Sequence, residues 1–219
     1  MCKLKKREVL AYLLACALAT ALIFSTYSGI TINNSLQACL EKNRSSSSTI
    51  AMWFHHCLGR ATDIEYLLRT YRKGFSENEL NEDNIEALIE GFFHEMWYSW
   101  WFLSSLKDLN PELSEYEKPL YFIDRFVLYT IIGWQSFTAG PTVQSVLAHL
   151  LSQAQTSGNY SISLTAFKEL NQTAFQEIDE LGTEVFESFL PFNATRLDNT
   201  VNMVEELQTI LGQWIDNYS

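Results

Sequence analysis

Several side chains that bind metals or transfer protons recur at helical spacing in this sequence. His55 and His56 fall in one predicted helix, Glu90 and His94 lie at i, i+4 in the next, and His149 falls in a later one. A helical bundle can bring such residues together around a metal ion. However, both the Glu-x-x-His spacing of di-iron bundles and the His-Glu-x-x-His spacing of zinc proteases are absent. One hypothesis is therefore a helical-bundle enzyme or metal- or ligand-binding protein that uses His55, His94, His149 and nearby carboxylates.

No other catalytic motif accompanies these residues. The sequence contains no Gly-x-Ser-x-Gly motif, no phosphate-binding glycine loop and no dinucleotide-binding fingerprint. The leading interpretation therefore assigns no catalytic residue, no metal and no cofactor, and it treats an enzyme as the alternative.

Cysteine chemistry is the second candidate. Cys2 and Cys16 fall in a segment that we predict to lie in the cytoplasm and the membrane. Cys39 and Cys57 would then both face an oxidising compartment, where two thiols can form a disulfide. We expect this bond, which would close a loop across a serine-rich stretch. The alternative is that Cys57 is a small buried apolar residue.

The N-terminal residues predict on which side of a membrane the rest of the chain lies. Four basic residues crowd positions 1–8, and no charge occurs from Val9 to Leu40. An apolar stretch of about 20 residues is long enough to span a bilayer, and basic residues before it predict a cytoplasmic N-terminus. The predicted parts are a cytoplasmic tail (1–8), a transmembrane signal-anchor (9–30), a linker (31–48) and a body (49–219).

A cleaved signal peptide is the alternative for this segment, with Ala17-Leu18-Ala19 as the cleavage site. In either case the body is predicted to lie outside the cytosol, in the secretory lumen, at the cell exterior, or in the periplasm if the chain is bacterial. From residue 9 onward the chain has 11 basic and 25 acidic residues, so it repels phosphate backbones and nucleic acid is not a predicted partner.

Glycosylation sequons support this location. Six asparagines begin an Asn-x-Ser/Thr sequence without proline, which is more than composition alone predicts. The predicted glycosylation sites are Asn33, Asn43, Asn159, Asn171, Asn193 and Asn217.

Apolar residues recur at three and four positions almost everywhere after the serine-rich stretch, which predicts an all-α bundle of about five to six helices. No segment alternates for long enough to be a convincing strand. The predicted helices cover about 49–73, 83–107, 119–139, 142–156, 163–190 and 193–218. The last two are joined by a short connection at Pro191, so we expect them to form an antiparallel pair.

Two adjacent charged residues lie within an otherwise apolar predicted helix. Asp124 and Arg125 interrupt the third predicted helix, which disfavours a second membrane span there. In one interpretation both side chains lie on a solvent-exposed edge of the helix. In the other, Asp124 is buried against a partner on another helix, such as Arg60, Arg69, Arg72 or a histidine.

The stretch "IEGFFHEMWYSWWFLSSL", residues 89–106, has three tryptophans beside a His-Glu pair. A stripe of this kind is more often core than a cofactor site. We therefore predict that one stripe of this helix packs in the core: Ile89, Phe92, Phe93, Met96, Trp97, Trp100, Trp101 and Leu103. Glu90, Glu95, Tyr98 and Ser105 are predicted to lie toward solvent.

About eight residues on the cytoplasmic side are too few for a signalling domain. The sequence therefore predicts that function resides in the body, as a membrane-tethered helical module that binds other proteins.

Overall fold

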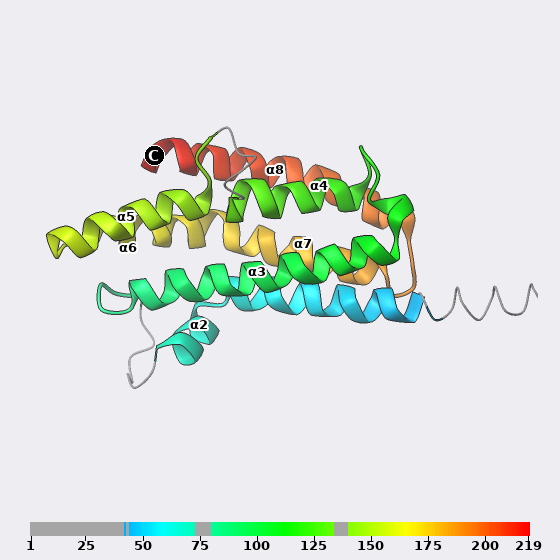
Figure 1. The fold of residues 1–219 in the computed structure, drawn as a ribbon, viewed down its shortest axis with the longest axis horizontal. Coiled ribbons are helices and arrows are strands. Elements are labelled where there is room, and N and C mark those ends of the chain that lie inside the picture. The colour runs from blue at the N-terminus through cyan, green and yellow to red at the C-terminus, as the bar shows by residue number, and fades with distance from the viewer. Residues whose placement is uncertain (1–41, 43, 73–79, 134–139) are drawn as a thin grey trace, which may run out of the picture. The chain divides into compact units, whose positions relative to one another are not determined.

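The computed structural model describes residues 42, 44–72, 80–133 and 140–219. Within them, Ser46–Ser219 forms one compact unit. The regular structure of these described residues is helical, without a strand, so the prediction of an all-α fold is confirmed for them (Figure 1).

Figure 1 shows the helices in chain order. A helical segment over 44–62 comes first. It is followed by α2 (Ile64–Tyr71), α3 (Ile85–Leu109), the short η1 (Pro111–Leu113), α4 (Pro119–Arg125), η2 (Phe126–Ile132), α5 (Val143–Ser157), α6 (Ser161–Leu170), η3 (Asn171–Phe175), α7 (Gln176–Ser188) and α8 (Ala194–Tyr218). The segments η2 and η3 are π-helical turns that continue α4 and join α6 to α7.

The first predicted helix is in fact two helices. Thr62 turns its hydroxyl back onto the carbonyls of Leu58 and Gly59, and Asp63 then leaves the helical conformation. The Asp63 carboxylate accepts a hydrogen bond from the Tyr66 backbone N–H at 3.0 Å and so caps α2. This break lets α2 change direction and pack against α3.

Helix pairing is antiparallel around the 44–62 segment. Against α3, Ser47 hydrogen-bonds Asn110, and Trp53 stacks on Phe102 with ring centroids 6.0 Å apart. Against α7, a Cβ added at Gly182 would lie 3.3 Å from the His55 Cα, which is tighter than an ordinary contact, so glycine favours this close approach. The 44–62 segment is thus held between α3 and α7.

The aromatic core lies where α3 meets α6 and η3. Phe92 is fully buried, stacks on Phe175 at 5.3 Å and meets Phe167 edge-on at 6.2 Å. From α8, the buried Trp214 donates its indole N–H to the Ala166 carbonyl at 2.9 Å. Edge-to-face and offset contacts of this kind stabilise a core beyond the area that they bury.

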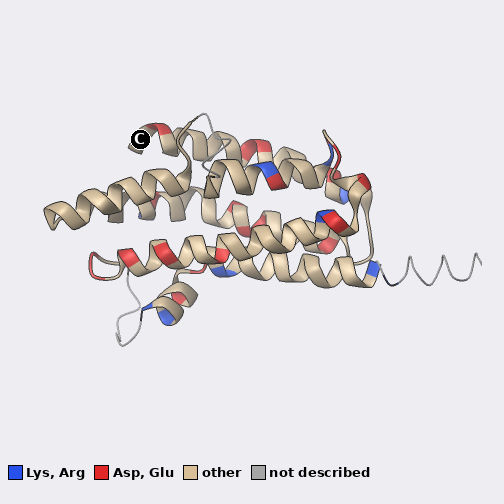
Figure 2. Cartoon of the chain, in the orientation of Figure 1, with Lys and Arg blue, Asp and Glu red and all other residues tan. Residues whose placement is uncertain are grey.

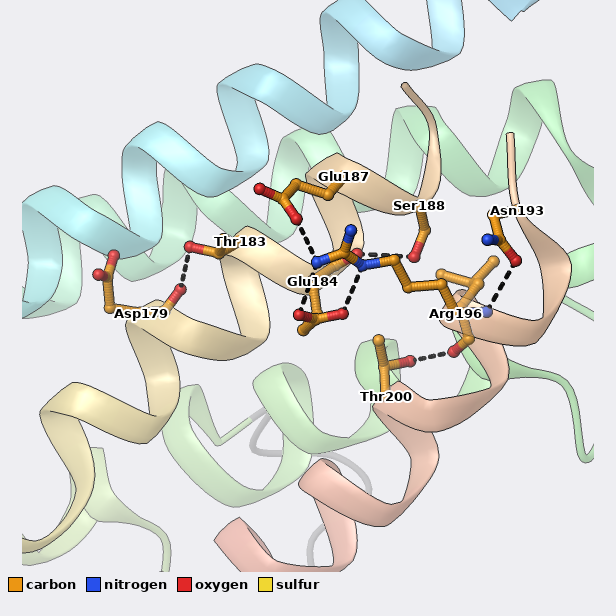
Figure 3. Close-up of polar contacts among 9 residues, drawn as sticks. Asp179, Thr183, Glu184, Glu187, Ser188, Asn193, Arg196 and Thr200 are labelled. Carbon is orange, nitrogen blue, oxygen red and sulfur yellow. Dashed lines mark hydrogen bonds and ion pairs between the residues drawn. The ribbon is translucent and has the colours of Figure 1, made fainter. Parts of the chain in front are cut away.

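Helices α7 and α8 form the antiparallel pair that the sequence predicts. The Arg196 guanidinium on α8 reaches back across the turn to Glu184 on α7, with nitrogen–oxygen distances of 2.6 and 2.8 Å, and it also contacts Glu187 (Figure 3). The Asn193 side chain caps α8 by accepting from the Arg196 backbone N–H. These contacts hold the pair together beside the turn at Pro191.

The Asp124-Arg125 pair is split between the interior and the surface. The Asp124 carboxylate is only 13% exposed, and it accepts from Lys107 at 2.7 Å and from the Trp100 indole at 3.1 Å. Arg125 is exposed and bonds the Tyr121 hydroxyl. The expectation of a buried Asp124 with a partner on another helix is therefore right in kind, but the partner is Lys107 rather than an arginine or a histidine.

The prediction of a membrane-spanning helix is contradicted for the part of the chain that the structure describes. None of the helices there is both long and apolar enough to cross a bilayer. The longest, α3 and α8, have 25 residues each and carry several charged side chains, which are costly in hydrocarbon. The predicted signal-anchor 9–30 and tail 1–8 lie outside the described residues, and residues 44–48 of the predicted linker are helical.

We expect Phe92→Ala to lower the free energy of unfolding by about 3 to 5 kcal/mol, because it leaves a cavity among the rings of Phe93, Phe167 and Phe175. Trp101→Ala, at a side chain that is 66% exposed, should change it by less than about 0.5 kcal/mol. Urea denaturation followed by circular dichroism measures both. An equal loss at the two positions would contradict this division between core and surface.

Candidate functional site

A row of large aromatic side chains faces solvent along α3. Trp97, Tyr98 and Trp101 are 37%, 41% and 66% exposed, and His94 on the same side is also exposed. Positions 94, 97, 98 and 101 recur at three and four, so they share one side of the helix. We call His94, Trp97, Tyr98 and Trp101 the aromatic face.

A cavity of about 330 Å³ opens at the aromatic face. Its walls are the four residues of the face together with Trp100. His94 meets Tyr98 edge-on at 4.7 Å, and Trp97 meets Trp100 edge-on at 5.5 Å. The volume lies at the lower end of the range found for small-ligand sites, and ring surfaces make up its walls.

This arrangement corrects part of the predicted core stripe: Trp97 and Trp101 are exposed, whereas Trp100 is half-buried and packs against the core. The rest of the predicted stripe is buried, and the buried side also includes residues outside it: Ile85, Leu88, Ile89, Phe92, Phe93, Met96, Ser99, Leu103 and Leu106. The prediction that Glu95 lies toward solvent is also wrong, because its side chain is only 4% exposed. The helix is apolar on nearly all sides in this region, so periodicity alone did not show which side would be buried.

A polar network borders the aromatic face at His94. The Tyr71 hydroxyl donates to the Glu95 Oε1 at 2.8 Å, and the Tyr66 hydroxyl donates to the same oxygen at 3.3 Å. The His94 Nδ1 lies 2.7 Å from the Tyr71 oxygen. Because the Tyr71 hydrogen is directed at Glu95, the His94 Nδ1 must carry the hydrogen of the second bond. The network thus fixes the orientation and tautomer of a histidine in the cavity wall.

Tyr71 reaches this position because residue 91 is glycine. A Cβ at Gly91 would lie 2.5 Å from the Tyr71 ring, closer than two carbon atoms can approach. Burial, and then the hydrogen bond to Glu95, raise the pKa of Tyr71 far above its ordinary value. The hydroxyl therefore stays protonated and remains a donor to the buried carboxylate.

The predicted disulfide between Cys39 and Cys57 is contradicted at Cys57. This residue carries a free thiol that is 3% exposed, on the inner side of the 44–62 segment. Burial, and then the nearby Glu95 charge, raise the pKa of the thiol to about 11. Cys57 is thus a small buried apolar residue, the alternative considered from the sequence, and Cys39 lies outside the described residues.

The structure does not gather the predicted metal-binding histidines. His55 stacks on Phe186 at 5.8 Å, His94 bonds Tyr71, and His149 bonds Gln153. No group of three or more His, Cys, Asp or Glu side chains in the described ranges is placed to hold a metal ion.

The predicted glycosylation sites are distributed over the surface. Asn159, Asn193 and Asn217 are exposed, and Asn171 is half-buried within η3. Asn33 and Asn43 lie outside the described residues. Glycosylation, and the location outside the cytosol that it would imply, stay predictions.

No protein-family model, no curated protein and no solved structure matches this chain. The features of the described residues that bear on function are therefore the aromatic face and the polar network of Tyr66, Tyr71, His94 and Glu95 beside it.

Tyr71→Phe tests the network. It removes the shorter hydrogen bond to Glu95 and leaves the buried carboxylate with Tyr66 alone, so we expect a loss of about 1 to 3 kcal/mol in the free energy of unfolding. Tyr121→Phe, which removes a hydroxyl bonded only to the exposed Arg125, is the control. A loss no larger than that of the control would show that the network contributes nothing to stability.

Cys57 is expected to resist alkylation by iodoacetamide in the folded protein. With a pKa of about 11, its reactive thiolate fraction at pH 8 is very small and rises roughly tenfold per pH unit up to that value. Mass spectrometry of unreduced peptides after pulse labelling, with denatured protein as the control, measures this. Rapid labelling at pH 8, or a peptide linking Cys57 to Cys39, would refute the assignment.

Proposed function

We propose that the chain is a helical protein-interaction module whose contact surface is the aromatic face. The observation that carries this proposal is the exposure of Trp101 to 66% within a row of other exposed aromatic side chains. Tryptophan and tyrosine are enriched in protein interfaces and dominate their binding energy. Contiguous exposed apolar patches on folded proteins also mark interaction sites.

The polar network supports the proposal because it orders the surface in advance. Its hydrogen bonds tie His94 to the buried Glu95 through Tyr71, so this part of the face has little freedom to lose when a partner binds. Trp53, which is 40% exposed and stacks on Phe102, adds a further exposed ring one helix away.

The alternative, an enzyme or metal-binding protein based on His55, His94 and His149, has less support. The three side chains contact Phe186, Tyr71 and Gln153 separately, on three different helices. Of the three, only His94 lines the cavity at the aromatic face.

Photo-cross-linking tests the proposed surface. A benzoylphenylalanine at position 101 should give one discrete adduct with another protein in cells that make the chain, which mass spectrometry then identifies. The same residue at Ile162, which is 58% exposed on α6, is the matched control and should give none. With the identified partner purified, Trp101→Ala should weaken binding by about 2 kcal/mol or more while leaving the melting temperature unchanged.

Three outcomes would refute this proposal. An adduct with a second copy of the chain would make the surface a self-association interface. Equal cross-linking at positions 101 and 162 would show that contacts are non-specific. Unchanged affinity in Trp101→Ala would place the contact surface elsewhere.

A further inference from the structure

The charged side chains of α3, the helix that carries the aromatic face, favour a positively charged ligand. Helix α3 carries Glu86, Glu90, Glu95 and Asp108 against the single basic Lys107, and Figure 2 shows this run of acidic residues along the helix. Lys107 is paired with Asp124 at 2.7 Å, so its charge is already compensated. The exposed Glu90 lies one helical turn from His94, and the whole chain has a net charge of −11.

A buried negative charge lies behind the wall of the cavity. Glu95 is 4% exposed, and its Oε2 makes no hydrogen bond with any of the described residues. Its other oxygen connects through the Tyr71 hydroxyl to His94, which lines the cavity. Charges in a poorly solvated environment are weakly screened, so this carboxylate favours a cation at the ring surfaces.

Stacking of a guanidinium on aromatic rings already occurs elsewhere in this bundle. The Arg125 guanidinium lies over the rings of Tyr121 and Tyr129 at 5.5 and 5.0 Å, and that of Arg60 lies over Tyr66 at 5.4 Å. Arginine is the side chain most often found in such contacts, because its planar, weakly hydrated cation stacks while its N–H groups still reach acceptors.

We infer that the aromatic face binds an arginine side chain of the partner protein, with the guanidinium stacked on Trp101 and Tyr98. This inference rests on the proposed function, since it names the group that the interaction surface recognises. The rings supply the stacking surface, and the carboxylates of α3 supply the favourable potential. An ammonium group carries the positive charge but has no planar surface for stacking. A neutral planar group stacks but carries no charge.

The test uses three small probes on the full-length chain labelled with ¹⁵N-tryptophan: N-acetyl-arginine amide, N-acetyl-citrulline amide and N-acetyl-lysine amide. Citrulline is the neutral planar counterpart of arginine, and lysine keeps the charge without the plane. The arginine probe should shift the Trp101 indole resonance in a saturable way and bind about two- to fivefold more tightly than either of the others.

Variants locate the binding site of the probe. Tyr98→Leu should weaken arginine binding about two- to fivefold, the value of one cation–π contact. Phe192→Leu, at an aromatic ring that is 43% exposed in the α7–α8 turn, is the matched control and should leave it unchanged. Equal binding of citrulline, equal binding of lysine, or equal effects of the two variants would overturn the inference.

A peptide from the cross-linked partner separates this inference from the proposed function. Replacing the contact arginine of that peptide with citrulline should weaken its binding at least fivefold. If citrulline has no effect while Trp101→Ala still abolishes binding, the protein-interaction function stands and the arginine assignment fails. If the arginine probe binds but no partner adduct forms at position 101, the proposed interaction function fails.

Discussion

Burial of the Glu95 carboxylate, together with the apolar side chains of α3 that enter the core, constrains how this helix is rotated about its own axis. A carboxylate removed from water is costly unless it is hydrogen-bonded, and here the donors are the hydroxyls of Tyr66 and Tyr71 on α2. Both can reach it only because the chain breaks at Asp63 and because Gly91 leaves room for the Tyr71 ring. Successive helical residues are about 100° apart, so positions 94, 97 and 101 point about 100° or more away from an inward position 95. Position 98 is only about 60° from it and lies at the edge between the two sides.

Core packing and the proposed contact surface therefore lie on different sides of one helix. The inner side packs Phe92 against Phe167 and Phe175, and the outer side presents Trp97, Tyr98 and Trp101 to solvent. The polar network lies between the two sides and restrains the orientation of His94. A substitution on the exposed side of α3 is therefore expected to change stability much less than one on the buried side.

The acidic side chains of this chain differ in what they contact. On α7, Glu184 and Glu187 are occupied by Arg196 and hold the last two helices together. On α3, the exposed Glu90 has no comparable structural role in the described part of the chain and lies beside the exposed rings. Aromatic surface combined with negative potential is the composition that suits a cationic side chain of a partner.

The sequence by itself determined the helical class and most helix boundaries. Thr142 and Asn193 cap α5 and α8 close to where their patterns predict, and the spacing around Pro191 indicated the α7–α8 pair, because caps, turns and apolar periodicity act over a few neighbouring residues. Tertiary structure alone decided the break at Asp63, the free thiol of Cys57 and the exposed side of α3. Apolar periodicity continues across residue 63, and α3 is apolar on nearly every side near its tryptophans. The orientation of α3 therefore depends on contacts such as Tyr71 with Glu95, whose partners lie 24 residues apart in the chain and meet only in the folded bundle.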